Sequence, residues 1–458
     1  MTSFLVRFKK GNMQKSMIEG NTLKLILNFS IPLLLGNLFQ QFYNVVDAAI
    51  VGQTLGSKAL AAVGASSSVQ FLILGFCMGI CQGFAIMVSQ SYGAKRLDEM
   101  HTYIYAGAVW TAITAFVVSI FVVVFCADIL HILQVNDEIF NDAYAYLVVI
   151  FLGIPFTLLY NYLSAILRAI GDSKTPFFFL AFSAFLNIGL DFFCILVLKW
   201  GCAGAAIATI FAQAVSGILC LLLIAFKVNI LHIPKSSRYV DKQHSLKLLA
   251  MGVPMGLQFS IPAIGYMVMQ PANNDWGTIY VSGFTAGMRI KSLMMCPFDA
   301  LGAAVSTFLS QNYGACKFER IQDGYHKGVM VSILYGAFAC VVMVFFGRIL
   351  SMMFVSANES QVLNASALYL RRMGYFYPVL GILITTRMSV QGLGYSARAM
   401  LAGFVEMIAR CIVALCFVPI FKYGAITWAD QTAWVAATLV LIPLWISAMR
   451  TVQKNELN

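Results

Sequence analysis

The sequence has few charged residues. Lysine, arginine, aspartate and glutamate make up 11% of its 458 residues, whereas hydrophobic residues make up 60%, and the mean hydropathy is +0.82. Soluble domains carry about 25% charged residues, so this composition excludes a soluble globular protein. It is typical of a chain that lies mostly within a membrane.

Patterns typical of metal sites and disulfide frameworks are also missing. The 11 cysteines contain no Cys-x-x-Cys spacing, and most lie in apolar runs, where cysteine acts as a small hydrophobic side chain. The five histidines lie at the ends of these runs or between them. These absences argue against a zinc site and against a histidine proton relay through the membrane. The histidines are His101, His131, His232, His244 and His326.

Twelve runs are long and apolar enough to cross a membrane, since a span needs about 20 mostly apolar residues. The second and the eighth are long and rich in glycine, which predicts tilts or kinks. The sequence therefore predicts an all-α polytopic membrane protein with twelve transmembrane helices. The predicted spans are 25–51, 59–90, 102–126, 141–166, 175–198, 202–226, 246–269, 278–310, 325–347, 363–386, 398–420 and 428–449.

The net charge of +11 is unevenly distributed between the connections. If the N-terminus lies inside the cell, the inner segments hold most of the basic residues. Arg371 and Arg372, near the outer end of the tenth span, are exceptions. The positive-inside rule then predicts that both termini are cytoplasmic, and we expect the protein to lie in the plasma (inner) membrane. The outer connections hold only Lys58, Lys199, Arg348 and Lys422.

The basic segments bear on partners and on processing. Their placement beside spans favours contacts with anionic membrane lipids over binding to nucleic acid. The segment 1–24 is basic and polar, and the first apolar run is too long for the core of a signal peptide, so no cleavable signal is evident.

The chain contains an internal repeat. Ser89–Ala94 reads SQSYGA and Ser310–Ala315 reads SQNYGA, at an offset of 221 (310 − 89 = 221). Pro32 recurs as Pro254 at an offset of 222. Three other pairs recur at an offset of 223: Pro155 with Pro378, Gly171 with Gly394, and Lys199 with Lys422.

The repeat predicts two lobes of six helices each. Because six is an even number, both lobes enter the membrane from the same side and are related by a pseudo-two-fold axis along the membrane normal. In transporters such lobes rock around a shared site. The predicted segments are a cytoplasmic N-terminal segment at 1–24, an N-lobe at 25–227, a cytoplasmic linker at 228–245, a C-lobe at 246–450 and a cytoplasmic tail at 451–458.

Polar side chains inside the spans are candidates for function, because charged groups are costly within a bilayer. Four carboxylates lie clear of the span edges: Asp47, Asp191, Asp299 and Glu406. Asn187 precedes Asp191 by four residues, so both lie on one helix face.

Asp191 and Thr209 are expected at similar depth in the outer half of the membrane, because the fifth span runs outward and the sixth inward. Asp47 lies near the outer end of the first span, so a cluster of Asp47, Asn187, Asp191 and Thr209 is geometrically possible. An all-oxygen cluster with two carboxylates can hold Na⁺ or a proton, and its occupancy would change the local charge. The alternative is that Asn187 and Asp191 only bond across a helix interface, while Asp47 is solvated near the membrane edge.

The second half has different polar residues. Glu406 and Arg410 have opposite charges four residues apart, which predicts a structural ion pair. Arg289 and Lys291 could face a central cavity or pair with Asp299. Candidate residues of a substrate cavity are Tyr43, Gln258, Met288 and Arg289.

An ordered series of motifs resembles the multidrug and toxic compound extrusion (MATE) family. The resemblance covers roughly residues 20–450 and is specific because the motifs occur in order within a duplicated chain. The motifs are Gln41–Asp47 (QFYNVVD), Ser89–Ala94 (SQSYGA), Leu167–Asp172 (LRAIGD), Asn187–Asp191 (NIGLD) and Gly204–Thr209 (GAAIAT).

The resemblance implies a monomeric antiporter that works by alternating access, without a cofactor. Na⁺ or H⁺ would enter as an organic, often cationic or amphipathic, compound leaves. The family's N-lobe cation site matches Asp47, Asn187, Asp191 and Thr209. Some members carry C-lobe carboxylates in spans that have none here, 246–269 and 363–386, which favours coupling through the N-lobe.

Three alternatives remain. A lipid-linked saccharide flippase of the same superfamily would share the fold, but we would expect a more basic cavity. A sugar-type facilitator without ion coupling would leave the carboxylates unexplained. An intramembrane aspartyl protease needs a Gly-x-Gly-Asp motif, whereas Ile188, Gly189 and Leu190 precede Asp191. With no other nucleophile or metal constellation, the sequence does not predict an enzyme.

Overall fold

The computed structural model describes residues 16–274 and 277–457, and within these ranges it contains helices, turns and loops but no strand. Residues 1–15, most of the predicted N-terminal segment, lie outside the described residues, as does residue 458 of the predicted tail.

The first half of the chain folds as a series of helices joined by short connections. They are α2 (Thr22–Leu55), α3 (Ser57–Gly93), α4 (Leu97–Val124), α5 (Cys126–Ile132), α6 (Asp137–Leu152), α7 (Ile154–Ala169), α8 (Lys174–Phe192), the π-helical segment η2 (Phe193–Val197) and α9 (Gly201–Lys227).

Two short 3₁₀ segments, η3 (Asn229–Leu231) and η4 (Lys235–Ser237), then lead into the second half. Its elements are α10 (Lys242–Asn274), α11 (Thr278–Gly314), α12 (Phe318–Ser351), α13 (Ser360–Gly374), α14 (Tyr377–Gly392), α15 (Ser396–Ile412), the π-helical segment η5 (Val413–Phe417), α16 (Val418–Phe421), α17 (Tyr423–Ile426) and α18 (Ala429–Leu457).

Each predicted span lies on helix, and two of them are broken. In the described residues ten helices are long and apolar enough to cross a membrane, and α6 with α7 makes an eleventh span bent by 46°. Pro155 lies in the first turn of α7, where a backbone N–H has no partner within the helix, so the N–H that proline lacks loses no hydrogen bond. The tenth predicted span is likewise split into α13 and α14, with Pro378 in the first turn of α14. Arg371 and Arg372 make α13 more polar than the other helices that form the predicted spans.

The duplication extends to irregular features of the backbone. The π segments η2 and η5 follow α8 and α15 at an offset of 220 (413 − 193 = 220). Gly171 and Gly394 have φ of +93° and +94°, a region open to glycine. Lys199 and Lys422 have φ of +57° and +55°, which is uncommon for residues with a side chain. Because both copies share these features, the halves have one fold.

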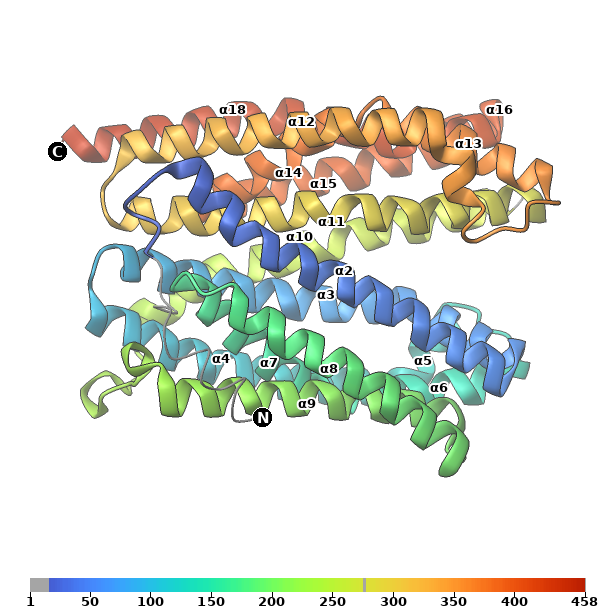
Figure 1. The fold of residues 1–458 in the computed structure, drawn as a ribbon, viewed down its shortest axis with the longest axis horizontal. Coiled ribbons are helices and arrows are strands. Elements are labelled where there is room, and N and C mark those ends of the chain that lie inside the picture. The colour runs from blue at the N-terminus through green and yellow to red at the C-terminus, as the bar shows by residue number, and fades with distance from the viewer. Residues whose placement is uncertain (1–15, 275–276, 458) are drawn as a thin grey trace.

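The helices form two lobes joined by two crossing helices (Figure 1). Helix α2 packs against α11 of the second half and α8 of the first, whereas α10 packs against α3 of the first half and α15 of the second. The start of α2 and the end of α18 lie at the same end of the molecule, which we call the termini side. The opposite end is the far side.

Each lobe has its own hydrophobic core, and the crossing helices contribute to both. Ile26 and Phe29 of α2 belong to the core of the second lobe, and Leu248 of α10 belongs to the core of the first. A third, small cluster between the lobes contains Ile86 and Met255.

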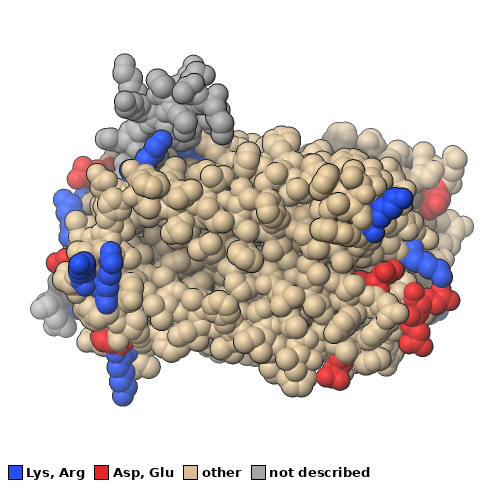
Figure 2. Space-filling view, turned by 90° about the horizontal axis from the view of Figure 1, so that it is seen from below, with Lys and Arg blue, Asp and Glu red and all other residues tan. Residues whose placement is uncertain are grey.

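The surface of the bundle suits a membrane. Figure 2 shows charged side chains at the two ends of one face and an uncharged band between them. Large hydrophobic side chains are exposed on the sides of the bundle, among them Phe116, Phe211 and Phe345, at 60%, 54% and 74%. Contact with lipid tails accounts for this exposure, which would be costly in water.

Helices α3 and α10 approach each other closely at glycine residues. A methyl group on Gly79 would lie 2.6 Å from the carbonyl oxygen of Met255, and one on Gly83 would lie 2.6 Å from the Cα atom of Gly252. Backbone atoms cannot give way as a flexible side chain can. Small residues at this interface therefore determine how near the two helices lie.

We predict that Gly83→Ala lowers the thermal unfolding midpoint of the purified protein in detergent, because overpacking costs about 1–3 kcal/mol. Gly64→Ala in the same helix is the matched control, since a methyl group there meets nothing within 4 Å. Alanine favours helix over glycine, so the control should unfold at the same or a higher temperature. Equal shifts in the two variants would contradict the close contact.

Candidate functional site

The four residues predicted to form a cation site come from three helices of the first lobe. Asp47 lies in α2, Asn187 and Asp191 in α8, and Thr209 in α9. These helices pack against one another. Asp191 lies two residues before the π segment η2, and π segments in helices often mark functional sites.

The structure brings all four side chains together. The Asn187 Nδ2 atom donates to Thr209 Oγ1 at 3.3 Å, and the carboxyl groups of Asp47 and Asp191 are close enough to interact electrostatically. Asn187 and Asp191 are 2% and 0% exposed. The cluster thus joins α2, α8 and α9 inside the lobe.

Most oxygens of this cluster lack donors. Among the described residues, Asp47 Oδ1, Asn187 Oδ1 and both carboxylate oxygens of Asp191 are buried without a hydrogen-bond partner. Buried polar atoms normally have partners, because leaving them unpaired costs about 1–3 kcal/mol each. Several acceptors that converge without a donor fit a hard cation, which prefers oxygen ligands, or a proton shared between the carboxyl groups.

Other polar side chains surround the cluster. The hydroxyl group of Tyr43, one turn before Asp47, lies near Gln40 and Gln213. Tyr146 of α6 is buried close to both carboxylates. Sequence reasoning placed Tyr43 in a substrate cavity and missed the other three. The spacing of Thr209 and Gln213, four residues apart in α9, was a signal for Gln213.

A network of buried ion pairs fills the second lobe. The predicted pair is present, with Arg410 Nη2 3.3 Å from Glu406 Oε2. Glu406 also pairs with Arg387 of α14. Arg410 Nε lies 3.2 Å from Asp430 Oδ1 at the start of α18, and Asp430 Oδ2 lies 2.7 Å from Lys291 Nζ.

Lys291 therefore pairs with Asp430, and the expected alternatives of a cavity position or a pair with Asp299 were wrong for this residue. Asp430 was missed because it lies near the edge of the twelfth predicted span, where a carboxylate needs no explanation. The Tyr369 hydroxyl is a further partner of Asp430 and donates to its Oδ2 atom at 2.8 Å.

Asp299 has a different environment. It is the exposed carboxylate of α11, and Arg387 is close enough to act on it electrostatically. Four residues further along the same helix face, Ala303 lines a small cavity between the lobes, to which Gln82 and Arg168 of the first lobe also contribute. By this helical spacing Asp299 faces the space between the lobes.

Three other predicted cavity residues have local partners in this conformation. Gln258 is 4% exposed and accepts a hydrogen bond from Gln391 Nε2 at 2.6 Å, so it is buried here instead of lining an open cavity. The Met288 sulfur accepts from the Tyr369 hydroxyl at 3.2 Å. The Arg289 guanidinium carbon lies 6.0 Å from the ring centre of Phe354, in the loop after α12.

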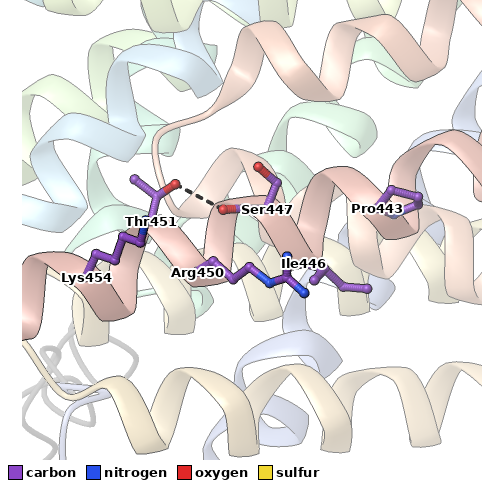
Figure 3. Close-up of a pocket in the computed structure, with 6 residues that line it drawn as sticks. All are labelled: Pro443, Ile446, Ser447, Arg450, Thr451 and Lys454. Atoms are coloured by element: carbon purple, nitrogen blue, oxygen red, sulfur yellow. Dashed lines mark hydrogen bonds between the residues drawn. The ribbon is translucent and has the colours of Figure 1, made fainter.

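A separate surface hollow lies at the end of α18 that is on the termini side (Figure 3). All of its lining residues come from this one helix, and none belongs to the predicted site. The lining changes along α18 from apolar to basic, as at the edge of a membrane. The residues are Pro443, Ile446, Ser447, Arg450, Thr451 and Lys454.

Two repeated helical lobes in a membrane, with a polar cluster inside one of them, define the class of duplicated transporters. The sequence model of the MatE family matches this chain twice, over residues 32–193 and 254–416. The chain therefore belongs to the MatE family, the multidrug and toxic compound extrusion proteins, and the predicted resemblance is confirmed.

Named relatives are transporters and not enzymes. The chain is 31% identical over 417 residues to the probable multidrug resistance protein YpnP of Bacillus subtilis (strain 168), covering 90% of each. It is 22% identical over 451 residues to the multidrug export protein MepA of Staphylococcus saprophyticus, covering 96% of this chain and 97% of the relative. A FAD transporter of Shewanella oneidensis is 23% identical over 367 residues, covering 79% and 80%. The chain is thus a multi-pass membrane protein of a multidrug efflux family.

Solved structures confirm the fold. A crystal structure of a MATE protein in complex with MaL6 matches with a TM-score of 0.89 at 20% identity, covering 96% of this chain and 99% of the other. A multidrug resistance MATE transporter in an outward-facing conformation matches with a TM-score of 0.85 at 19% identity, covering 96% and 97%. The predicted arrangement of twelve helices in two lobes is therefore the observed fold.

The ion network predicts a large effect of Asp430→Asn on stability. The substitution leaves Lys291 buried without its carboxylate, and breaking a buried pair costs about 3–5 kcal/mol. We expect a clearly lower thermal midpoint of the purified protein in detergent. The control is Asp323→Asn, which removes a half-exposed pair with Lys327 worth at most about 1 kcal/mol. Similar midpoints for both variants would contradict a stabilising role of the network.

Proposed function

We propose that this protein is a secondary active multidrug exporter of the inner membrane that antiports Na⁺ or H⁺ against organic, often cationic, compounds. The observation that carries the proposal is the donor-free oxygen cluster of Asp47, Asn187 and Asp191. A buried site with two carboxylates and no cationic side chain suits a positive ion as its occupant. In this proposal the termini side faces the cytoplasm.

Occupancy of the cluster changes the interaction between two helices. Without a cation, the ionised carboxylates of Asp47 on α2 and Asp191 on α8 repel each other at short range. Na⁺ or a proton removes this repulsion and lets the helices pack more closely. The cation thus favours one arrangement of the lobe over another, as ion coupling requires.

Helix α2 can carry this change to the other lobe. Its later part holds Asp47 among first-lobe helices, while Ile26 and Phe29 near its start belong to the core of the second lobe. A shift of α2 at the cation site therefore acts on the packing between the lobes. This supports alternating access in which ion binding and lobe rocking are linked.

A carboxylate between the lobes supports cationic cargo. Asp299 faces the interlobe space and lies outside the ion pairs around Asp430 and Glu406. The proposed cargo site therefore offers a negative charge to an organic cation.

Asp47→Asn and Asp191→Asn should each reduce ethidium export from cells to the level of cells without the protein, because the neutral amide removes a charge that attracts the coupling ion. Export is measured by ethidium fluorescence, with expression checked by immunoblot. Asp323→Asn, at the surface of α12, is the control and should export at the wild-type rate. Wild-type export by both site variants would refute the first-lobe coupling site.

The coupling ion is identified by imposing one gradient at a time. In proteoliposomes loaded with dye, an inward Na⁺ gradient or an inward proton gradient should drive dye efflux, and Asp191→Asn should abolish the response. Efflux under neither gradient in the wild-type protein would refute antiport.

Asp299→Asn should weaken export of organic cations about two- to tenfold, the range for loss of one partly solvated charge interaction. Export of a neutral amphipathic dye should be unchanged, and Asp299→Glu should retain cation export. An equal loss for neutral and cationic dyes would show that Asp299 does not select for charge.

A further inference from the structure

The repeated motif noted in the sequence lies where the lobes meet. Ser89–Ala94 ends α3 of the first half and Ser310–Ala315 ends α11 of the second, both on the termini side. The proposed ion site does not use these residues, and only Ser89 and Ser310 line the cavity between the lobes. Their recurrence in both halves therefore needs a separate physical reason.

The glutamine of each motif bonds to the other lobe. Gln90 Nε2 donates to the carbonyl oxygen of Gly392, the last residue of α14, at 3.0 Å. Gln311 Nε2 donates to the carbonyl oxygen of Ala169, the last residue of α7, at 2.8 Å. Donors and acceptors are equivalent pairs in the repeat (311 − 90 = 221; 392 − 169 = 223). The carbonyls at a helix end have no partner within the helix, so each is free to accept from the glutamine of the other lobe. The Gly392 carbonyl also accepts from Ser310 Oγ at 3.0 Å.

The glycine of each motif allows this contact. A methyl group on Gly93 would overlap the backbone carbonyl of Gln311, and one on Gly314 would overlap the backbone carbonyl of Gln90. The ends of α3 and α11 thus touch through their backbones. No other residue type fits at either position while the lobes are together.

The chain before α2 adds an asymmetric contact. The backbone N–H of Met17 donates to Gln311 Oε1 at 2.9 Å, and Arg320 Nη2 donates to the Met17 carbonyl at 3.2 Å. Lys317 Nζ donates to the Ile18 carbonyl at 2.8 Å. Gln311 therefore uses both ends of its amide, and it also links the N-terminal segment to the second lobe.

We propose that Gln90 and Gln311 form a symmetric pair of latches that holds the termini side of the two lobes closed. Both hydrogen bonds join one lobe to the other, so both must break before the lobes separate there. The neighbouring glycines set the distance at which the latches close. This device is independent of which ion or cargo the protein carries.

Hydrogen exchange in lipid nanodiscs tests the latches on the full chain without any cargo. The reporters are the backbone amides of Ala94–Arg96 and Ala315–Lys317, which bond to Gln90–Tyr92 and Gln311–Tyr313 respectively. Gln90→Ala and Gln311→Ala should each speed exchange at both motifs about two- to tenfold, the range for loss of one neutral hydrogen bond. Gly93→Ala should do the same by wedging the lobes apart.

The matched control is Gln431→Ala, which removes a buried glutamine that bonds to Thr427 at 2.8 Å, one turn earlier in the chain. It should leave exchange at both motifs unchanged. Faster exchange at the mutated motif alone would overturn the proposal. Unchanged exchange rates in all latch variants, or exchange rates that rise uniformly along the chain in all of them, would also overturn it. Because no transport is measured, this outcome is separate from the success or failure of the proposed antiport.

Discussion

Two helices that belong to both lobes hold this molecule together. Helix α2 starts in the core of the second lobe and ends in the first, and α10 does the reverse. Neither lobe can move without changing the packing of a helix that also lies in the other. This sharing of α2 and α10 between the lobes underlies three features of the structure. They are the glycine contacts between α3 and α10, the location of Asp47 on α2, and the contacts between the lobes on the termini side. Because the lobes share these two helices, a movement of one lobe changes the packing of the other.

The two halves share one backbone fold but differ in whether their buried carboxylates are paired with basic side chains. In the first lobe, Asp47 and Asp191 lie together without a donor or a cationic side chain. In the second, Glu406 and Asp430 are each paired with two basic side chains. Asp191 falls opposite Val413 or Ala414 in the repeat. The buried carboxylates Glu406 and Asp430 of the second lobe are thus neutralised by basic side chains, whereas Asp47 and Asp191 have no such partner, as the proposed cation site requires.

Much of the fold could be predicted from sequence because its signals are local or periodic. Apolar runs indicated the helices, and the nearly constant offsets of 221–223 residues indicated the lobes. The cluster of Asp47, Asn187, Asp191 and Thr209 could be anticipated because depth along two antiparallel helices follows from counting residues. The pairing of Lys291 with Asp430 could not, because the two lie far apart in the sequence and Asp430 is near a span edge. Gln258 was placed in a cavity because polarity alone does not reveal a partner such as Gln391.

The bonds of Gln90 and Gln311 join uncharged groups, an amide and a carbonyl, at both positions. Dissolved salt screens charged pairs but leaves such neutral dipoles almost untouched. Changes of pH over the physiological range do not alter either group, since neither titrates. The strength of these two hydrogen bonds therefore does not depend on salt or on pH over the physiological range. Their strength stays constant while ionic conditions vary, and in the proposed antiport only the carboxylates in the first lobe respond to ions.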